Sequence, residues 1–74
     1  MAEITFEIKE SIGVIGESNK GWTKELNLVS WNNYSPKYDI REWDPDHEKM
    51  SKGLTFTKEE LLKLRELLSE LDLD

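Results

Sequence analysis

The segment KYDIREW, at positions 37–43, combines two cations and a large aromatic ring. Lys37, Arg41 and Trp43 share one parity and alternate with residues of the other parity. Alternation with a period of two predicts a β-strand with one buried and one open face. Cations beside an indole on an open strand face suit single-stranded nucleic acid, because the ring stacks on bases and the charges meet phosphates. The residues alone equally allow Trp43 to lie at a sheet edge or a dimer seam, with Arg41 stacked on it.

Two neighbouring segments extend this candidate site. Trp22 and Trp31 lie in the segment before it, and the loop after it ends in Lys52 and Gly53, where glycine would let another backbone approach closely. A regular strand cannot place Trp22 and Trp31 on one face. Either a bulge near residues 25–28 swaps the faces, or one of the two rings belongs to the core. The predicted nucleic-acid-binding residues are Lys20, Trp22, Lys24, Trp31, Lys37, Arg41, Trp43, Lys49, Lys52 and Gly53.

The order YDIREW, then the acidic turn DPDHEKM, then KGLT followed by a helix, resembles the positive cofactor four family. Those proteins are small transcriptional coactivators that bind single-stranded DNA. The Trp-Asn turn and the PDHEKM run are most similar to their bacterial YdbC-like branch, and the resemblance runs from about position 21 to position 68. It implies that Arg41, Trp43, Lys52 and Gly53 line a single-strand channel. It also implies that Trp31 falls near a DNA-facing aromatic residue of the family.

The apolar pattern predicts the elements that would position these residues. Apolar side chains at even positions from Ile4 to Val14 predict one long strand, or two collinear strands bent at Glu10, with one apolar face. Gly13 and Gly16 indicate bends or a bulge there. Further strands are predicted at positions 22–31, 37–43 and 52–57. The run TKEE at positions 57–60 is a capping-box pattern that predicts the start of a helix. The predicted fold is α+β, a curved four-stranded antiparallel sheet followed by one C-terminal helix, in a single domain over residues 1–74.

The predicted helix carries more leucine than one thin sheet can cover. A chain of 74 residues buries too little surface to be comfortably stable alone, and without cysteine it has no disulfides. Leucines at three- and four-residue spacing occupy about half of the helix circumference. We therefore expect the helix both to cover its own sheet and to form a homodimer with a second copy. The predicted interface residues are Leu61, Leu64, Leu68 and Leu71.

The net charge of −6 argues against a polyanionic ligand, but the charges are unevenly distributed. Residues 1–19 hold one cation and four acids, and residues 54–74 hold three cations and six acids. Residues 20–53 hold six of each and are neutral. Local patches decide which groups make contact, so the central segment remains the predicted binding region.

No catalytic site and no metal site are predicted. The turn at positions 44–48 offers carboxylates and one histidine, but its spacing matches no EF-hand, and zinc would need more imidazole or thiolate ligands. The serines lack a nucleophile-elbow pattern, and no phosphate-binding loop precedes a helix. Without a signal peptide or a membrane-spanning run, we expect a cytoplasmic protein that needs no cofactor.

These observations predict a sequence-tolerant single-stranded DNA-binding protein that acts in transcription or in replication and repair. RNA is a possible ligand as well, because base stacking does not read the sugar, and the transcription machinery is a possible partner. The alternative is a protein-interaction module that uses the Trp/Arg face or the acidic helix. Trp and Arg are also favoured anchors of protein interfaces, so the residue types do not separate the two functions.

Overall fold

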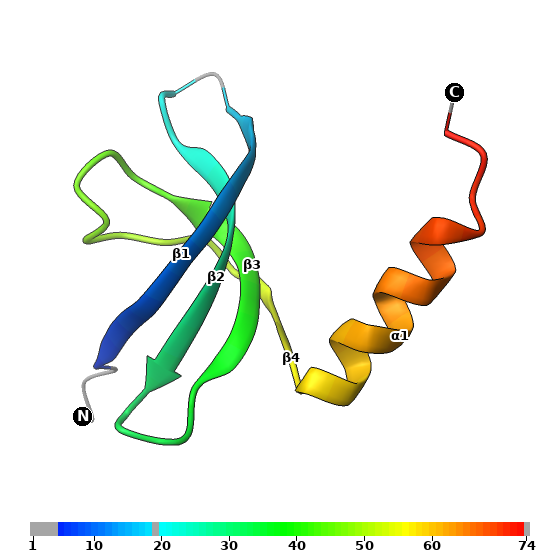
Figure 1. The fold of residues 1–74 in the computed structure, drawn as a ribbon. Coiled ribbons are helices and arrows are strands. Elements are labelled where there is room, and N and C mark those ends of the chain that lie inside the picture. Colours follow the sequence, from blue (N-terminus) through cyan, green and yellow to red (C-terminus); the bar gives the residue numbers. More distant parts are fainter. Residues whose placement is uncertain (1–4, 19, 74) are drawn as a thin grey trace.

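The computed structural model describes residues 5–18 and 20–73 and has the predicted α+β architecture (Figure 1). Four strands form one antiparallel sheet in the order β1-β2-β3-β4, and one helix follows them. The elements are β1 (Phe6–Glu17), β2 (Thr23–Trp31), β3 (Lys37–Trp43), β4 (Leu54–Phe56) and α1 (Lys58–Ser69). The predicted sheet and helix are confirmed, and the homodimer stays a prediction.

β1 is bent by three shifts in its register against β2. Two of them end at Gly13 and Gly16, so the predicted bulges are confirmed. Each bulge adds an unpaired residue and reverses which side the following residues face. Ile12 lies within one of these shifts and is 42% exposed, so the regular alternation behind the predicted apolar face from Ile4 to Val14 is interrupted there. Ile4 lies outside the described residues.

The core lies on one face of the sheet, which we call the inner face. β2 pairs with β3 without a shift along the whole of β3, so alternate residues of both strands share this face. The buried side chains on the inner face are Glu25, Asn27, Val29, Asp39 and Trp43. Three of these five carry polar groups, so the core depends on hydrogen bonds as much as on apolar contact.

The positions of the other two Trp residues match neither predicted arrangement. β2 has no bulge against β3. Trp31 lies on the inner face because it follows Val29 by two residues at the end of β2, whereas Trp22 precedes the first residue of that strand. Both rings are half-buried, so neither belongs to the core.

Residues 44–53 fold back along β3 before the chain enters β4 (Figure 1). Met50 forms a β-bridge with Trp43, and the Ser51 amide donates to the Glu42 carbonyl. Gly53 then passes so close to β3 that a Cβ atom there would overlap Cβ of Arg41 and the Ile40 carbonyl. The close approach predicted at Gly53 is thus made to the protein's own strand.

α1 begins with the predicted capping box. The Glu60 amide donates to Oγ1 of Thr57 over 3.1 Å, and the Thr57 amide donates to Oε1 of Glu60 over 2.9 Å. The helix leads away from the sheet, and only its first turns lie beside β3 and β4 (Figure 1). Leu68 is 48% exposed and Leu71 is 57% exposed, so this single chain leaves part of the leucine face uncovered. Among the described residues, no helix has the length and apolar character that crossing a membrane requires.

Candidate nucleic-acid interface

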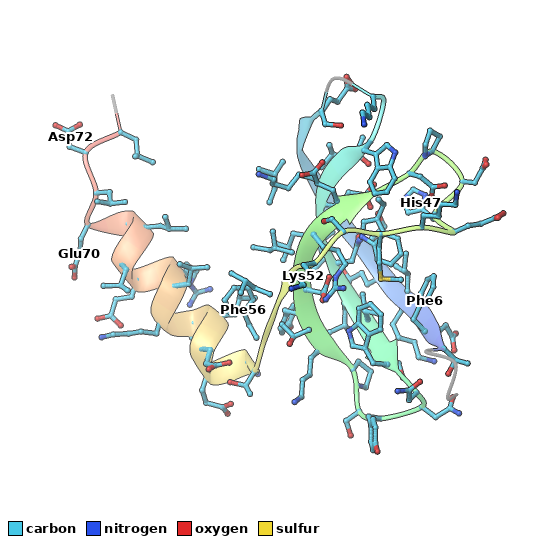
Figure 2. The ribbon with its side chains drawn as sticks, turned by 180° about the vertical axis from the view of Figure 1, so that it is seen from behind. Phe6, His47, Lys52, Phe56, Glu70 and Asp72 are labelled. Atoms are coloured by element: carbon cyan, nitrogen blue, oxygen red, sulfur yellow. The ribbon has the colours of Figure 1, made fainter. Side chains whose placement is uncertain are left out.

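Trp43 is a core residue, and the prediction that it presents its ring on an open strand face is wrong. Its exposed fraction is 0%. The Trp43 ring centroid lies 5.1 Å from that of Phe6 and 5.7 Å from that of His47, in tilted and stacked arrangements respectively. Phe6 and His47 lie on the same side of the sheet (Figure 2). The strand parity was correct, but residues 44–53 cover the face on which Trp43 lies.

Arg41 is half-buried on the inner face, and its charge is balanced there. Nε donates to Oδ1 of Asp39 over 2.6 Å and Nη2 donates to Oδ2 over 2.8 Å. The Asp39 side chain is 0% exposed and the Arg41 side chain is 14% exposed. The guanidinium carbon lies 4.5 Å from the centroid of the Trp31 ring, a cation–π contact. Arg41 therefore supports Trp31, and not Trp43 as the residue types alone allowed.

Trp31, Arg41 and Lys52 line one groove of about 560 Å³, which we call the Trp31 groove. Its remaining lining residues are Asn32, Met50, Ser51 and Thr55. Lys52 is exposed where residues 44–53 lead into β4, and it forms no ion pair with any described residue (Figure 2). The groove thus combines a half-buried ring, a guanidinium behind it and a free ammonium.

A second hollow of about 420 Å³ lies next to the Trp31 groove. It is lined by Lys20, Trp22, Glu42, Ser18 and Ser51, and Ser51 also lines the Trp31 groove. The Trp31 groove contains Arg41 of the inner face, whereas the second hollow contains Glu42 of the opposite face, so among their described lining residues the two hollows share only Ser51.

The other predicted binding residues are spread more widely. Lys37 is exposed at the start of β3 on the inner-face parity, and Lys49 is exposed on the turn that follows β3. Lys24 pairs with Glu42 in the β2–β3 ladder, on the face opposite Arg41. The structure therefore brings Trp31, Arg41, Lys52 and Gly53 together and separates Lys24 from them. The binding roles of all these residues stay predictions.

A buried hydrogen-bond network that the sequence did not reveal ties residues 44–53 to the sheet. Nε2 of His47 lies 2.9 Å from Oε2 of Glu25, and Glu25 also accepts hydrogen bonds from Thr23 and Asn27. Burial raises the pKa of Glu25, but the bonds from Thr23, Asn27 and His47 outweigh it and leave that pKa below its ordinary value. The alternation of a strand places residues 23, 25 and 27 on one face, so their proximity could be predicted from the sequence. The contact with His47 could not, because it depends on the path of the loop.

The acidic turn uses its first carboxylate to close the chain on itself. Oδ1 of Asp44 accepts the amides of Glu48 and Lys49 over 2.8 and 3.0 Å. These hydrogen bonds lower the pKa of Asp44, and the one from the Lys49 amide has the largest effect. His47 has a positive φ of 57°, which turns its ring towards Glu25 and Trp43. The turn thus acts as a support for the groove wall that follows it.

Comparison with known proteins gives two matches. The sequence profile of the family described as Transcriptional Coactivator p15 (PC4) matches residues 18–67, a span that contains the Trp31 groove and the second hollow. An uncharacterized protein of Treponema pallidum (strain Nichols) is 45% identical over 69 residues, which are 93% of this chain and 81% of that protein. The narrower likeness to the YdbC-like branch stays a prediction.

Proposed function

Because the chain belongs to the Transcriptional Coactivator p15 (PC4) family, we propose that it binds single-stranded DNA with little sequence preference. The family is one of nucleic-acid-binding domains rather than enzymes, and its coactivator character favours a task in transcription. The proposal extends this family property to a particular surface, the Trp31 groove and the hollow beside it.

One observation carries the proposal: the Trp31 ring lines an open groove with Arg41 stacked against it and Lys52 beside it. A base stacked on an aromatic side chain is stabilised by about 1–3 kcal/mol, whichever base it is. Because Asp39 already pairs with Arg41, Lys52 is the cation in this groove that is free to meet a phosphate. Stacking by Trp31 and charge from Lys52 then act on adjacent parts of one nucleotide.

The second hollow extends the proposed path by at least one more stacking position. Trp22 is half-buried there and Lys20 is exposed, which repeats the pairing of ring and ammonium found in the first groove. A strand that passes Ser51 would meet both pairs in succession. Neither pair includes a group that reads one base uniquely, so we expect strands of any sequence to bind.

A homodimer is part of the proposal, because the apolar surface of the single chain is large. Leu54, Leu62, Leu67, Leu68 and Leu71 are between 43% and 64% exposed, and all lie on β4, on α1 or directly after it. Several exposed leucines on neighbouring elements favour an interface. A second copy would present the same leucines, so the two helices could cover each other across a twofold axis.

Fluorescence anisotropy with a labelled oligothymidine strand tests the function. We expect saturable binding to oligothymidine, competition by single strands of other sequence, and much weaker competition by a duplex, whose base faces are hidden. Trp31→Ala should weaken binding by about 5- to 150-fold, the loss of one stacked base. Failure to bind any single strand would favour the protein-interaction alternative, and an RNA strand in the same assay measures the preference between sugars.

A further inference from the structure

The turn between β2 and β3 holds the amide of Asn32 in one orientation. Asn32 and Asn33 both have positive φ, 50° and 67°, and the Tyr34 amide donates to the Trp31 carbonyl over 2.8 Å. This is a tight turn at the start of residues 32–36, which connect β2 to β3, and Asn is well suited to its positive φ angles. The Asn32 amide also donates to the Thr5 carbonyl over 2.8 Å, which fixes the backbone of the turn to the residue just before β1.

The side chain of Asn32 is fixed by the same neighbour. The backbone amide of Thr5 lies 2.9 Å from Oδ1 of Asn32, and Oγ1 of Thr5 lies 3.3 Å from it. A backbone N–H can only donate, so the atom that faces it must be the amide oxygen. This leaves Nδ2 with two N–H donors and no hydrogen-bond partner among the described residues. Asn32 is exposed and lines the Trp31 groove together with Trp31.

We propose that Asn32 is a further binding residue, which donates a hydrogen bond from Nδ2 to an acceptor on the edge of the base stacked on Trp31. The inference rests on the proposed function and names a base-edge contact within it. A group that can only donate is compatible with sequence tolerance, because every base carries a carbonyl oxygen or a ring nitrogen that accepts. Thr5 acts as a positioning residue, since its amide and hydroxyl determine which end of the Asn32 amide faces the groove.

The test exchanges the donor for an acceptor and uses the neighbouring residue as control. Asn32→Asp keeps the shape of the side chain, its tolerance of positive φ and an oxygen for Thr5, but it removes the N–H donors. Asn33→Asp adds the same charge in the same turn, and Asn33 lines a different hollow, with Ser30 and Phe6. The ligands are oligothymidine and a strand of 2,4-difluorotoluene nucleotides, which stack like thymine but lack its carbonyl oxygens.

We expect Asn32→Asp to weaken oligothymidine binding about three- to tenfold more than Asn33→Asp, the usual effect of one hydrogen bond. On the difluorotoluene strand the two variants should bind equally. Asn32→Gly and Asn33→Gly repeat the comparison without added charge, and thermal unfolding confirms that each variant is folded.

Three outcomes would overturn the inference. Equal losses for the two positions on oligothymidine would show that Asn32 makes no contact. An excess loss that persists on the difluorotoluene strand would place the contact on the sugar or phosphate. Wild-type protein that binds neither strand would refute the proposed function itself, and the inference with it, whereas the first two outcomes leave the proposed function standing.

Discussion

Replacing Trp43 and Trp31 one at a time tests whether Trp43 stabilises the core while Trp31 contributes to binding. Trp43 is fully buried between Phe6 and His47, so Trp43→Ala removes a large apolar side chain and leaves a cavity. Such replacements cost about 3–5 kcal/mol of unfolding free energy. For a domain of this size that lowers the melting temperature by roughly 12–40 °C. Trp31 is half-buried and lines an open groove, so Trp31→Ala should lower affinity far more than stability.

Trp43→Phe makes the comparison cleaner, because it keeps an aromatic ring in the core. Nε1 of Trp43 has no hydrogen-bond partner in the described part of the chain, so phenylalanine loses no bond there and should remain folded. Circular dichroism gives the melting temperature of each variant, and anisotropy with oligothymidine gives its affinity. Folded Trp43→Phe should bind like the wild type. If it instead loses more than tenfold in affinity while Trp31→Ala keeps full affinity, the assignment of the two rings is reversed.

Four further predictions follow from individual contacts. The slope of log affinity against log salt concentration should be about −1.4 to −2.1 if two or three lysines contact phosphates. Lys52→Ala should make this slope shallower by about 0.7, and the control Lys63→Ala, on the helix, should leave it unchanged. Gly53→Ala should lower the melting temperature, since its Cβ would overlap the Ile40 carbonyl, and a wild-type melting curve would contradict that packing. Because folding lowers the pKa of Glu25, its carboxylate should contribute fully to the unfolding free energy at neutral pH, and this contribution should be lost as pH falls below about 4.5. In urea titrations, the unfolding free energy of Glu25→Gln should therefore fall less steeply with acid than that of the wild type. Leu68→Glu should shift light scattering from a dimer mass to a monomer mass or unfold the protein, and a wild-type monomer at micromolar concentration would refute the dimer.

The sheet and the helix could be predicted because local pattern determines them. The capping box at Thr57 and the glycines that bend β1 each act on neighbouring residues, and both appear where the sequence places them. The parity of Lys37, Arg41 and Trp43 was also correct. Which face of the strand stays open was not, because that depends on where residues 44–53 fold, and a single His47–Glu25 contact helps to hold them there.

In the candidate site, the contact partners of individual residues could not be predicted from the sequence. A cation and an indole two positions apart suggested a contact between Arg41 and Trp43, but the structure pairs Arg41 with Asp39 and stacks it on Trp31 from the neighbouring strand. Cross-strand neighbours depend on register, and the register of the second predicted strand could not be fixed while the faces of Trp22 and Trp31 stayed ambiguous. Asn32 was missed for a related reason, since only the contact with Thr5 shows that its donors are free.

Because Asp39 balances the charge of Arg41, the proposed binding of a polyanion by a chain with a net charge of −6 would depend on other groups. A free guanidinium on the inner face would attract phosphates, but its burial without a partner would be costly, and Asp39 removes that cost. The pair then acts as a rigid, nearly neutral support that holds the Trp31 ring in place. In the proposed function, attraction of phosphates would come from exposed lysines such as Lys52, which forms no ion pair with any described residue. Affinity should therefore depend mainly on stacking, which the acidic N-terminal and C-terminal segments do not oppose.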